Sequence, residues 1–318
     1  MLIVMRLPLD KADTKILAAL MKNARLPITS LAKASGVSRE VATYRLKRLE
    51  EKGIILNYVT EVNVEKLGYV GAAVFVATKT HRESEFRKFL RESRNICWVG
   101  EHVGIWDFGM SILGKNNAEI DTYFSEMYNK FKDFIIDHRF TLHKKNYYFY
   151  EKLFGEKSIR KQKSSGKYIA DELDKKILRI LVTNARADYV ELAKKIPLTA
   201  PAIKQRIRQL ENSGYIERYS VFLDYSKLNA YQYSIFIINK NIYDRQKLLA
   251  YLAEHQDVCF ICEYTGDPFM EFGVFVDNPY HLRKVIKVIE ESFPDNRIME
   301  ISLQKEIVSV APAKCVFD

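Results

Sequence analysis

Apolar residues between positions 13 and 52 recur every three or four residues, which is the spacing of amphipathic helices. This pattern predicts three short helices, over residues 13–21, 28–34 and 38–52. Ser38 suits the N-cap of the third helix, because its hydroxyl can accept a hydrogen bond from a free backbone N–H. The side chains expected to pack inward from that helix are Val41, Ala42, Leu46 and Leu49. Gly53 should end it, and residues 55–68 are expected to form a short hairpin or wing.

From residue 69 onwards strand-like and helix-like segments alternate. The segments are a strand at 69–78, a helix at 83–93, two strands at 95–102 and 105–113 around a glycine turn, a helix at 117–131 and a last strand at 134–148. The order β-α-β-β-α-β is that of a ferredoxin-like domain. We therefore expect a helical domain followed by a mixed one.

The whole arrangement occurs twice in the chain, which is the strongest signal in the sequence. The helical segment from Asp13 to Ile55 recurs from Asp174 to Ile216 at a constant separation, so that no gap is needed to align the two. In the mixed segment Gly104 matches Gly266 at almost the same separation. Further on, Phe108 and Gly109 match Phe272 and Gly273 at a larger separation, which predicts a two-residue insertion in GDPFME. Residues 231–309 repeat the β-α-β-β-α-β order.

These patterns predict an α+β protein with two copies of a winged helix-turn-helix domain, each followed by a ferredoxin-like βαββαβ domain. The first copy is expected to occupy residues 1–62 and 63–154, and the second residues 171–223 and 224–318. Between them, residues 155–170 contain the run GEKSIRKQKSSGK, whose polar Ser, Gly and Lys content is typical of a linker. The chain therefore reads as a duplicated two-domain protein.

Charge narrows the choice of partners. The chain has 318 residues and a formal net charge of +10, which favours a polyanionic partner. The excess is local, since residues 1–60 contain eleven Lys and Arg but five Asp and Glu. The N-terminal run MLIVMRLPLD is too short and too soon charged for a secretory signal, and no apolar run is long enough for a membrane span. We therefore expect a cytoplasmic protein without a membrane partner.

The four cysteines do not indicate a disulfide framework in a chain of this length. Cys259 and Cys262 form the motif CFIC, which raises the question of a metal or redox site. They lie in an apolar strand-like run, where residues three apart point to opposite faces, and no second close pair completes a zinc site. We interpret them as core cysteines, and the sequence indicates no metal and no cofactor.

A short helix, a turn and a second capped helix have the lengths of a helix-turn-helix, whose second helix lies in the DNA major groove. The alternative is an ordinary three-helix bundle with a solvated charged face. The outer faces favour DNA, because their side chains suit base edges and phosphates. The candidate DNA-binding residues are Ser38, Arg39, Glu40, Thr43, Tyr44, Lys47 and Arg48 in the first copy, and Thr199, Lys204, Gln205 and Arg208 in the second.

Two further positions leave alternatives open. Arg45 and Arg206, at the edge of these faces, suit either a phosphate contact or a structural ion pair with a first-helix carboxylate such as Asp13 or Asp174. Gly36 suits a left-handed turn, but its counterpart Pro197 has φ fixed at a negative value by its ring and cannot adopt one. The turn of the second copy should therefore differ, and its DNA binding is the weaker prediction.

Residues 9–55, from LDKADTKILAAL to RLKRLEEKGII, resemble the N-terminal domain of the Lrp/AsnC family of bacterial and archaeal transcriptional regulators. The resemblance extends over residues 9–150 and 173–310. It implies double-stranded DNA as a partner, homo-oligomerisation through the βαββαβ domains, and in many members an amino-acid effector. It also implies an effector site at the turn between the two central strands, which here holds Gly104, Ile105 and Asp107, with Gly266, Asp267 and Glu271 in the second copy.

Two other functions remain open. Siroheme decarboxylases resemble the same two-domain family, and a fused chain could imitate their paired subunits. The residues for such an enzyme would be His81, His102, His138, His143, Tyr147 and Tyr148, although the histidines lack matching histidines in the second copy. A third candidate is a metabolite-sensing or scaffold protein without DNA binding, against which the basic face of the first copy argues. The leading prediction is a non-enzymatic, sequence-specific DNA-binding regulator.

Overall fold

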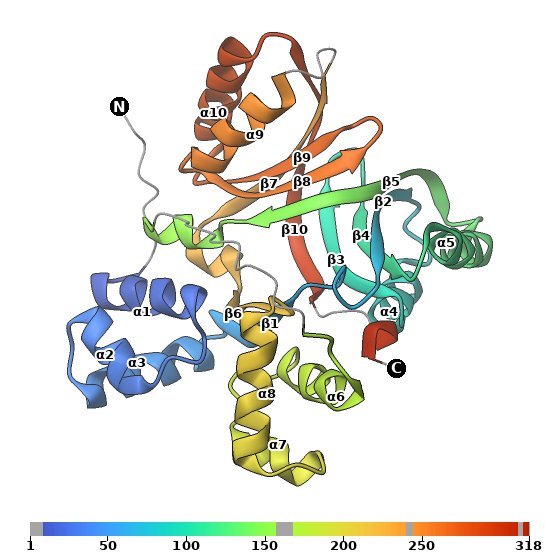
Figure 1. The fold of residues 1–318 in the computed structure, drawn as a ribbon. Helices are drawn as coiled ribbons and strands as arrows, with labels where there is room; N and C mark the ends of the chain where they lie inside the picture. The colour runs from blue at the N-terminus through green and yellow to red at the C-terminus, as the bar shows by residue number, and fades with distance from the viewer. Residues whose placement is uncertain (1–8, 157–167, 240–243, 311–313, 318) are drawn as a thin grey trace. The chain divides into compact units, whose positions relative to one another are not determined.

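The computed structural model describes residues 9–156, 168–239, 244–310 and 314–317, so most of the predicted linker lies outside the described residues. The chain forms two compact units, each of which takes corresponding parts from both repeats (Figure 1). Of the described residues, the helical unit contains 9–68, 156, 168–228 and 316–317. The sheet unit contains 69–155, 229–239, 244–310 and 314–315. Duplication is therefore expressed as pairing of like parts within one chain.

The helical unit contains two three-helix heads. The first head has α1 (Lys11–Lys22), α2 (Ile28–Ser35) and α3 (Arg39–Glu51), and the second has α6 (Glu172–Leu181), α7 (Tyr189–Lys195) and α8 (Ala200–Asn212). Fully buried side chains such as Leu17 and Leu31 fill the first head, and Leu178 and Leu192 fill the second. These equivalent pairs lie at the repeat separation, and the predicted helices of both copies are confirmed.

Of the hairpin or wing predicted after the third helix, the local hairpin is wrong. Residues 55–62 form strand β1 (Ile55–Val62), which pairs antiparallel with β6 (Ile216–Leu223) of the other repeat. The hydroxyl of Thr60 donates to the carbonyl of Leu181, and that of Ser220 donates to the carbonyl of Met21. Each strand therefore closes the end of the other head's first helix. Pairing across the repeats satisfies backbone groups that a local hairpin would have satisfied within one copy.

The sheet unit contains both βαββαβ repeats, as predicted. The first consists of β2 (Val70–Thr78), α4 (Glu83–Glu92), β3 (Ile96–Val103), β4 (Phe108–Gly114), α5 (Asn117–Phe131) and β5 (Ile135–Tyr148). The second consists of β7 (Tyr231–Asn239), α9 (Arg245–Glu254), β8 (Val258–Thr265), β9 (Met270–Val276), α10 (Pro279–Ser292) and β10 (Asn296–Val310). Short 3-10 helices lie at Tyr150–Phe154, Tyr225–Leu228 and Lys314–Phe317.

The two four-stranded sheets join into one closed barrel of order β10-β3-β4-β2-β5-β8-β9-β7. The closure uses two equivalent contacts, because β5 pairs antiparallel with β8, and β10 pairs antiparallel with β3. Closing a sheet on itself removes the unpaired edges that otherwise invite association with another chain. Both outer strands of each repeat are thus engaged by the other repeat.

Two apolar cores lie between the barrel and its helices. In Figure 1, α4 and α5 flank the strands of the first repeat, and α9 and α10 those of the second. The first core includes Val74, Phe86 and Met127, and the second includes Ile235, Leu248 and Phe272. Since strand side chains alternate between faces, the intervening residues of each strand point into the barrel. The barrel interior is therefore a separate layer from both cores.

The predicted insertion in the second repeat is also wrong. The N–H of Asp107 donates to the carbonyl of Val76, and that of Phe269 donates to the equivalent Ile237. Val76 pairs with Phe108 in the first repeat, and Ile237 pairs with Met270 in the second. The equivalent of Phe108 is therefore Met270, at the same separation as the turn glycines, and both connecting turns have the same length. The pairs Phe108-Gly109 and Phe272-Gly273 are thus alike in sequence but do not occupy equivalent positions in the fold.

Among the described residues, no helix is both long and apolar enough to cross a membrane.

Candidate nucleic-acid interface

The third helix of the first head begins as the sequence predicts. The hydroxyl of Ser38 accepts a hydrogen bond from the N–H of Val41 at 3.3 Å, which caps α3. Before it, Gly36 ends α2 in the left-handed conformation at φ 73°. One inward-facing assignment was wrong, because the side chain of Val41 is 40% exposed. Val41 is the third residue of α3 and lies in its first turn.

In the second head a different turn precedes the third helix, the recognition helix of a helix-turn-helix, as predicted from Pro197. The cap of α7 is Ile196, which is extended rather than left-handed. The hydroxyl of Thr199 then accepts a hydrogen bond from the N–H of Ala202 at 3.4 Å and caps α8. The helix that follows therefore has the same length and cap as its counterpart despite the altered turn.

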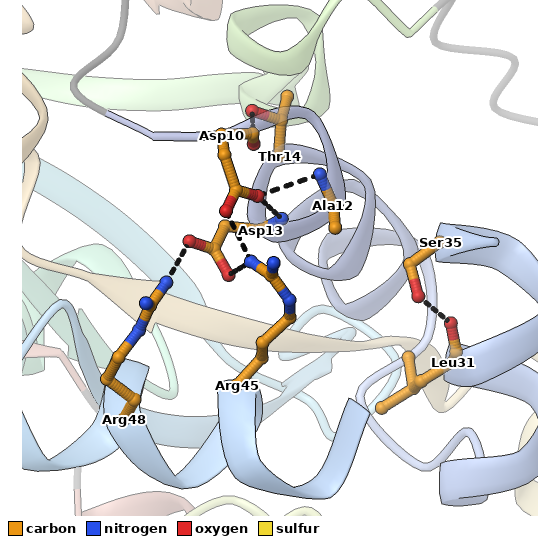
Figure 2. A network of polar contacts seen from close by, with 8 residues as sticks. All are labelled: Asp10, Ala12, Asp13, Thr14, Leu31, Ser35, Arg45 and Arg48. Carbon is orange, nitrogen blue, oxygen red and sulfur yellow. Dashed lines mark hydrogen bonds and ion pairs between the residues drawn. The ribbon is translucent and has the colours of Figure 1, made fainter. Parts of the chain in front are cut away.

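A buried carboxylate holds the third helix of the first head against the first (Figure 2). Asp13 is 2% exposed and accepts hydrogen bonds from Arg45, at 2.9 Å, and from Arg48. Arg45 also contacts Asp10, and this hydrogen bond holds the pKa of Asp10 below its ordinary value. The ion-pair alternative for Arg45 is therefore correct. Arg48, predicted to contact DNA, lies in the same cluster.

The second head repeats this cluster with one arginine instead of two. Arg206 donates to Asp171 at 2.8 Å and to the fully buried Asp174 at 3.0 Å. Asp174 also accepts a hydrogen bond from the hydroxyl of Tyr168 at 2.5 Å. A buried carboxylate without partners is costly, so these contacts fix the position of α8 relative to α6. The ion-pair alternative is correct for Arg206 as well.

The remaining predicted residues of each third helix face solvent. In the first head Arg39, Glu40, Thr43, Tyr44 and Lys47 are exposed, and Tyr44 is 66% exposed. In the second head Lys204, Gln205 and Arg208 are exposed. Lys47 makes a 3.5 Å contact with Glu51 in which both side chains are largely exposed, so the pair contributes little to stability and the amine is available to another anion. Each helix thus presents a separate polar face beside its buried anchor.

Removal of a cap should weaken each head without changing its outer face. Ser38→Ala and Thr199→Ala are each expected to lower the free energy of unfolding of the helical unit by about 1 kcal/mol, because a helical N–H loses its partner. Urea unfolding followed by circular dichroism measures this loss. Thr43→Ala, one turn further along α3, is the control and should change stability by less than about 0.5 kcal/mol. Equal effects of all three variants would contradict the capping role.

A contact between the heads was not predicted from the sequence. The guanidinium of Arg25 lies 5.2 Å from the ring centre of Tyr219, whose hydroxyl donates to Glu211 at 2.8 Å. In the other direction Arg186 lies 5.0 Å from the ring of Tyr58, whose hydroxyl donates to Glu50. Each chain of contacts runs from the first loop of one head, through a β1 or β6 tyrosine, to the recognition helix of the other.

These contacts link the first loop of each head to the third helix of the other head. Arg25 donates a further hydrogen bond to the carbonyl of Ala185 at 2.7 Å, and burial raises the pKa of Tyr219, so the phenol remains a donor. The signal in the sequence was the recurrence of Arg25 and Glu50 in the second copy. Periodicity within one head could not identify it, because the partners belong to the other head.

The predicted effector residues of the first repeat lie between β3 and β4. Ile105 is 58% exposed, while the carboxylate of Asp107 accepts a hydrogen bond from the N–H of Thr78 at 2.7 Å. Gly104 has φ 155°, and a Cβ there would lie 2.9 Å from the hydroxyl oxygen of Ser302. Asp107 therefore stabilises the turn, and Gly104 permits close approach of β10.

The three effector residues of the second repeat do not share one turn. Gly266 and Asp267 follow β8 and are exposed, whereas Glu271 is the second residue of β9 and is 4% exposed. Its carboxylate accepts a hydrogen bond from the hydroxyl of Tyr264 at 2.5 Å, and burial raises its pKa. Placement of Glu271 in the turn was wrong because it followed from the insertion. Its equivalent is Gly109, not Asp107.

The residues of the enzyme alternative occupy different environments. His81 is half exposed near Asp133, and His138 packs against the rings of Phe124 and Tyr128. On the inner face of the barrel, His102 is buried and His143 is partly buried. Tyr147 donates to Glu263 at 3.1 Å, and Tyr148 stacks at 6.0 Å on Tyr150. No common site collects all six.

The CFIC cysteines lie in the core, as predicted. Cys259 and Cys262 are both free and both buried in β8, and burial raises the pKa of each thiol. A raised thiol pKa leaves little of the reactive thiolate. Within the ranges that the structure describes, no three His, Cys, Asp or Glu side chains gather as metal ligands would.

Family profiles match the two heads. Residues 9–55 match the winged helix-turn-helix DNA-binding family, and residues 171–211 match the AsnC-type helix-turn-helix domain. Two such heads, each with a polar recognition-helix face, define a DNA-binding transcriptional regulator.

Similarity to whole regulators supports this class. The chain is 32% identical over 120 residues to the HTH-type transcriptional regulator FL11 of Pyrococcus furiosus. The matched segment covers 37% of this chain and 80% of FL11. It is 31% identical over 126 residues to the DNA-binding transcriptional activator DecR of Escherichia coli, covering 38% of this chain and 82% of DecR. The chain belongs to the Lrp/AsnC family of transcriptional regulators.

Among solved structures, the siroheme decarboxylase NirDL is similar over 96% of both chains, with a TM-score of 0.63 and 14% sequence identity. At this identity the likeness shows that the two proteins share a fold. The duplicated architecture is thus not unique to this chain.

Proposed function

We propose that the chain recognises two unlike DNA half-sites, one with each head. The observation that supports this most directly is the contrast between the buried carboxylates that anchor the third helices and the outer faces of those helices. Asp13 and Asp174 hold equivalent arginines in both heads, whereas the exposed Thr43, Tyr44 and Lys47 are replaced by Lys204, Gln205 and Arg208. A shared framework with different outer side chains presents different hydrogen-bond patterns to the bases.

In this proposal each outer side chain has a defined role. Arg39, Lys47, Lys204 and Arg208 contact phosphates or guanine edges, while Thr43, Tyr44 and Gln205 contact bases and sugars. Ser38 and Thr199 cap the helices, and Glu40 disfavours a phosphate or guanine close to its own position. Arg48 contributes through its contact with Asp13, by fixing the angle of α3. The second head, with its extended turn, has the weaker share of the affinity.

A small-molecule effector such as an amino acid would act through the sheet unit. The proposed contacts are the turn residues Gly104 and Ile105, with Asp107 supporting the turn, and the exposed Gly266 and Asp267 of the second repeat. Glu271 would take part only from inside the barrel. We also propose the domain boundaries given in the sequence analysis and a cytoplasmic location.

Homo-oligomerisation would need a surface other than the strand edges. In the described barrel, β3, β5, β8 and β10 are all paired within one chain. The outer faces of α4, α5, α9 and α10 carry the surfaces available for further copies.

The test of DNA recognition is fluorescence anisotropy with the DNA upstream of the protein's own gene and a shuffled control. The native fragment is expected to bind at least about a hundredfold more tightly, with affinity falling steeply as salt rises. Weak and equal binding of both DNAs would end the proposal. The matched variant is Lys287→Ala, an exposed lysine of α10, which should leave both affinities unchanged.

The two heads are distinguished by Lys47→Ala and Arg208→Ala. Each variant is expected to weaken binding of the native fragment by about 1–3 kcal/mol, because each loses contacts to one half-site. Mutating the corresponding half-site in the DNA should then cost the variant less than it costs the parent protein. If both variants respond to the same half-site, the heads do not read separate sequences.

The enzyme alternative shares the NirDL fold and is tested independently of DNA. Added siroheme should leave the visible spectrum of the tetrapyrrole unchanged in the presence of this protein if the chain is a regulator alone. A shifted spectrum that His102→Gln abolishes would favour the decarboxylase alternative. Decarboxylation itself is followed by the mass of the tetrapyrrole.

A further inference from the structure

One ion pair crosses the inside of the barrel between the two repeats. Arg139 on β5 contacts Glu300 on β10, and their side chains are 17% and 1% exposed. The ring of Trp106 lies 5.0 Å from the guanidinium of Arg139. Burial of this kind makes any uncompensated charge expensive.

The two charged residues occupy equivalent positions of the duplicated fold. Arg139 pairs with Phe75 of β2, and Glu300 pairs with Phe236 of β7. Phe75 and Phe236 are themselves equivalent and contact each other across the barrel, with ring centres 4.9 Å apart. Each residue thus contacts its own equivalent from the other repeat, Arg139 with Glu300 and Phe75 with Phe236, where the first repeat faces the second.

Equivalent positions that meet in this way would carry identical residues in a pair of identical repeats. Two first repeats would bring Arg139 against a second Arg139, and two second repeats would bring Glu300 against a second Glu300. Each arrangement buries two like charges, whereas the mixed arrangement buries opposite ones. Neighbouring positions have diverged as well, since Gly109 faces the barrel where the second repeat has Glu271.

We propose that the Arg139–Glu300 pair selects the partner of each βαββαβ repeat, so that a first repeat pairs with a second repeat and not with its own kind. The partner is normally the other half of the same chain. A second copy of the chain with complementary charges would serve equally well. This proposal concerns the sheet unit and does not depend on the DNA sites.

The test uses charge reversals in the full chain, with melting temperature as the first readout. Arg139→Glu and Glu300→Arg are each expected to lower the melting temperature of the sheet unit by roughly 5–10 °C, because each buries two like charges. The double variant R139E/E300R should recover most of that loss. Reversal of the exposed pair Arg283 and Glu290 on α10 is the control and should change the melting temperature by less than about 2 °C.

Mixing the two single variants gives a readout that a purely structural ion pair would not produce. Unfolded together and refolded, Glu300→Arg and Arg139→Glu chains should form a one-to-one complex of twice the 37.1 kDa chain mass, with exchanged repeats. Each such complex restores two opposite-charge contacts. Light scattering after gel filtration measures the mass, and differently tagged chains show the composition.

Three results would overturn the proposal. The first is a double variant as unstable as the single ones, and the second is single variants as stable as the parent. The third is a mixture in which the two single variants show no preference for each other over themselves. If neither single variant is soluble, the double variant decides alone, since it carries the same two side chains in exchanged positions.

Discussion

Two histidines inside the barrel resist protonation, and together they are expected to contribute a loss of about 4 kcal/mol to the free energy of unfolding of the sheet unit between pH 7.5 and pH 5. Burial lowers the pKa of both His102 and His143 from 6.5 to about 4. Between these values the unfolded chain binds more protons than the folded chain. Stability is therefore lost as the pH falls through this window, and each histidine contributes about half of the loss.

The fluorescence of the two tryptophans measures this effect in the sheet unit alone, since both Trp98 and Trp106 belong to it. Urea unfolding at a series of pH values gives the free energies. His102→Gln and His143→Gln should each remove about 2 kcal/mol of the pH dependence. Glu271 acts in the opposite sense, because its raised pKa adds stability at low pH. A pH-independent free energy between 5 and 7.5 would contradict the prediction.

Loss of the buried carboxylate that anchors the third helix should strongly destabilise the helical unit. Asp13→Ala leaves Arg45 and Arg48 without their common partner, and Asp174→Ala leaves Arg206 with Asp171 alone. Each is expected to cost about 2–3 kcal/mol, less than a fully buried pair because the arginines are partly exposed. Hydrogen exchange of the helical amides reports the loss separately from the sheet unit.

DNA affinity should fall with the anchor even though neither carboxylate lies on the outer face. Glu51→Ala, an exposed carboxylate on α3, is the control and should change stability by less than about 0.5 kcal/mol. Arg206→Lys is informative, because a single amine cannot reproduce both contacts of the guanidinium at Asp171 and Asp174. Unchanged DNA binding in Asp13→Ala would show that the angle of α3 is set by the apolar core alone.

Local patterns predicted local structure well in this chain. The spacing of Leu17, Leu20 and Leu31, the caps Ser38 and Thr199, and the alternation in the βαββαβ segments are all properties of residues close in sequence. The ion-pair alternative for Arg45 followed from helix geometry. Only the choice between two alternatives needed the structure.

Contacts between the repeats could not be predicted in the same way. The strand from Ile55 has no signal that selects Ile216–Leu223 as its partner over a hairpin. The Phe-Gly match suggested an insertion, and only hydrogen-bond register showed that Phe108 corresponds to Met270. The contact of Arg139 with Glu300 depends on both repeats at once. Residues distant in sequence meet through topology, which a single sequence does not display.

Joining both repeats in one polypeptide changes how binding depends on the amount of protein. Two separate subunits would dissociate on dilution, and DNA recognition by paired heads would then be lost below a threshold concentration. Here β1 and β6 belong to one chain, so the pairing of the two heads has a fixed effective concentration that does not change on dilution. At low protein concentration, occupancy of a DNA site should therefore be proportional to the protein concentration. The concentration threshold that assembly from separate subunits imposes should be absent.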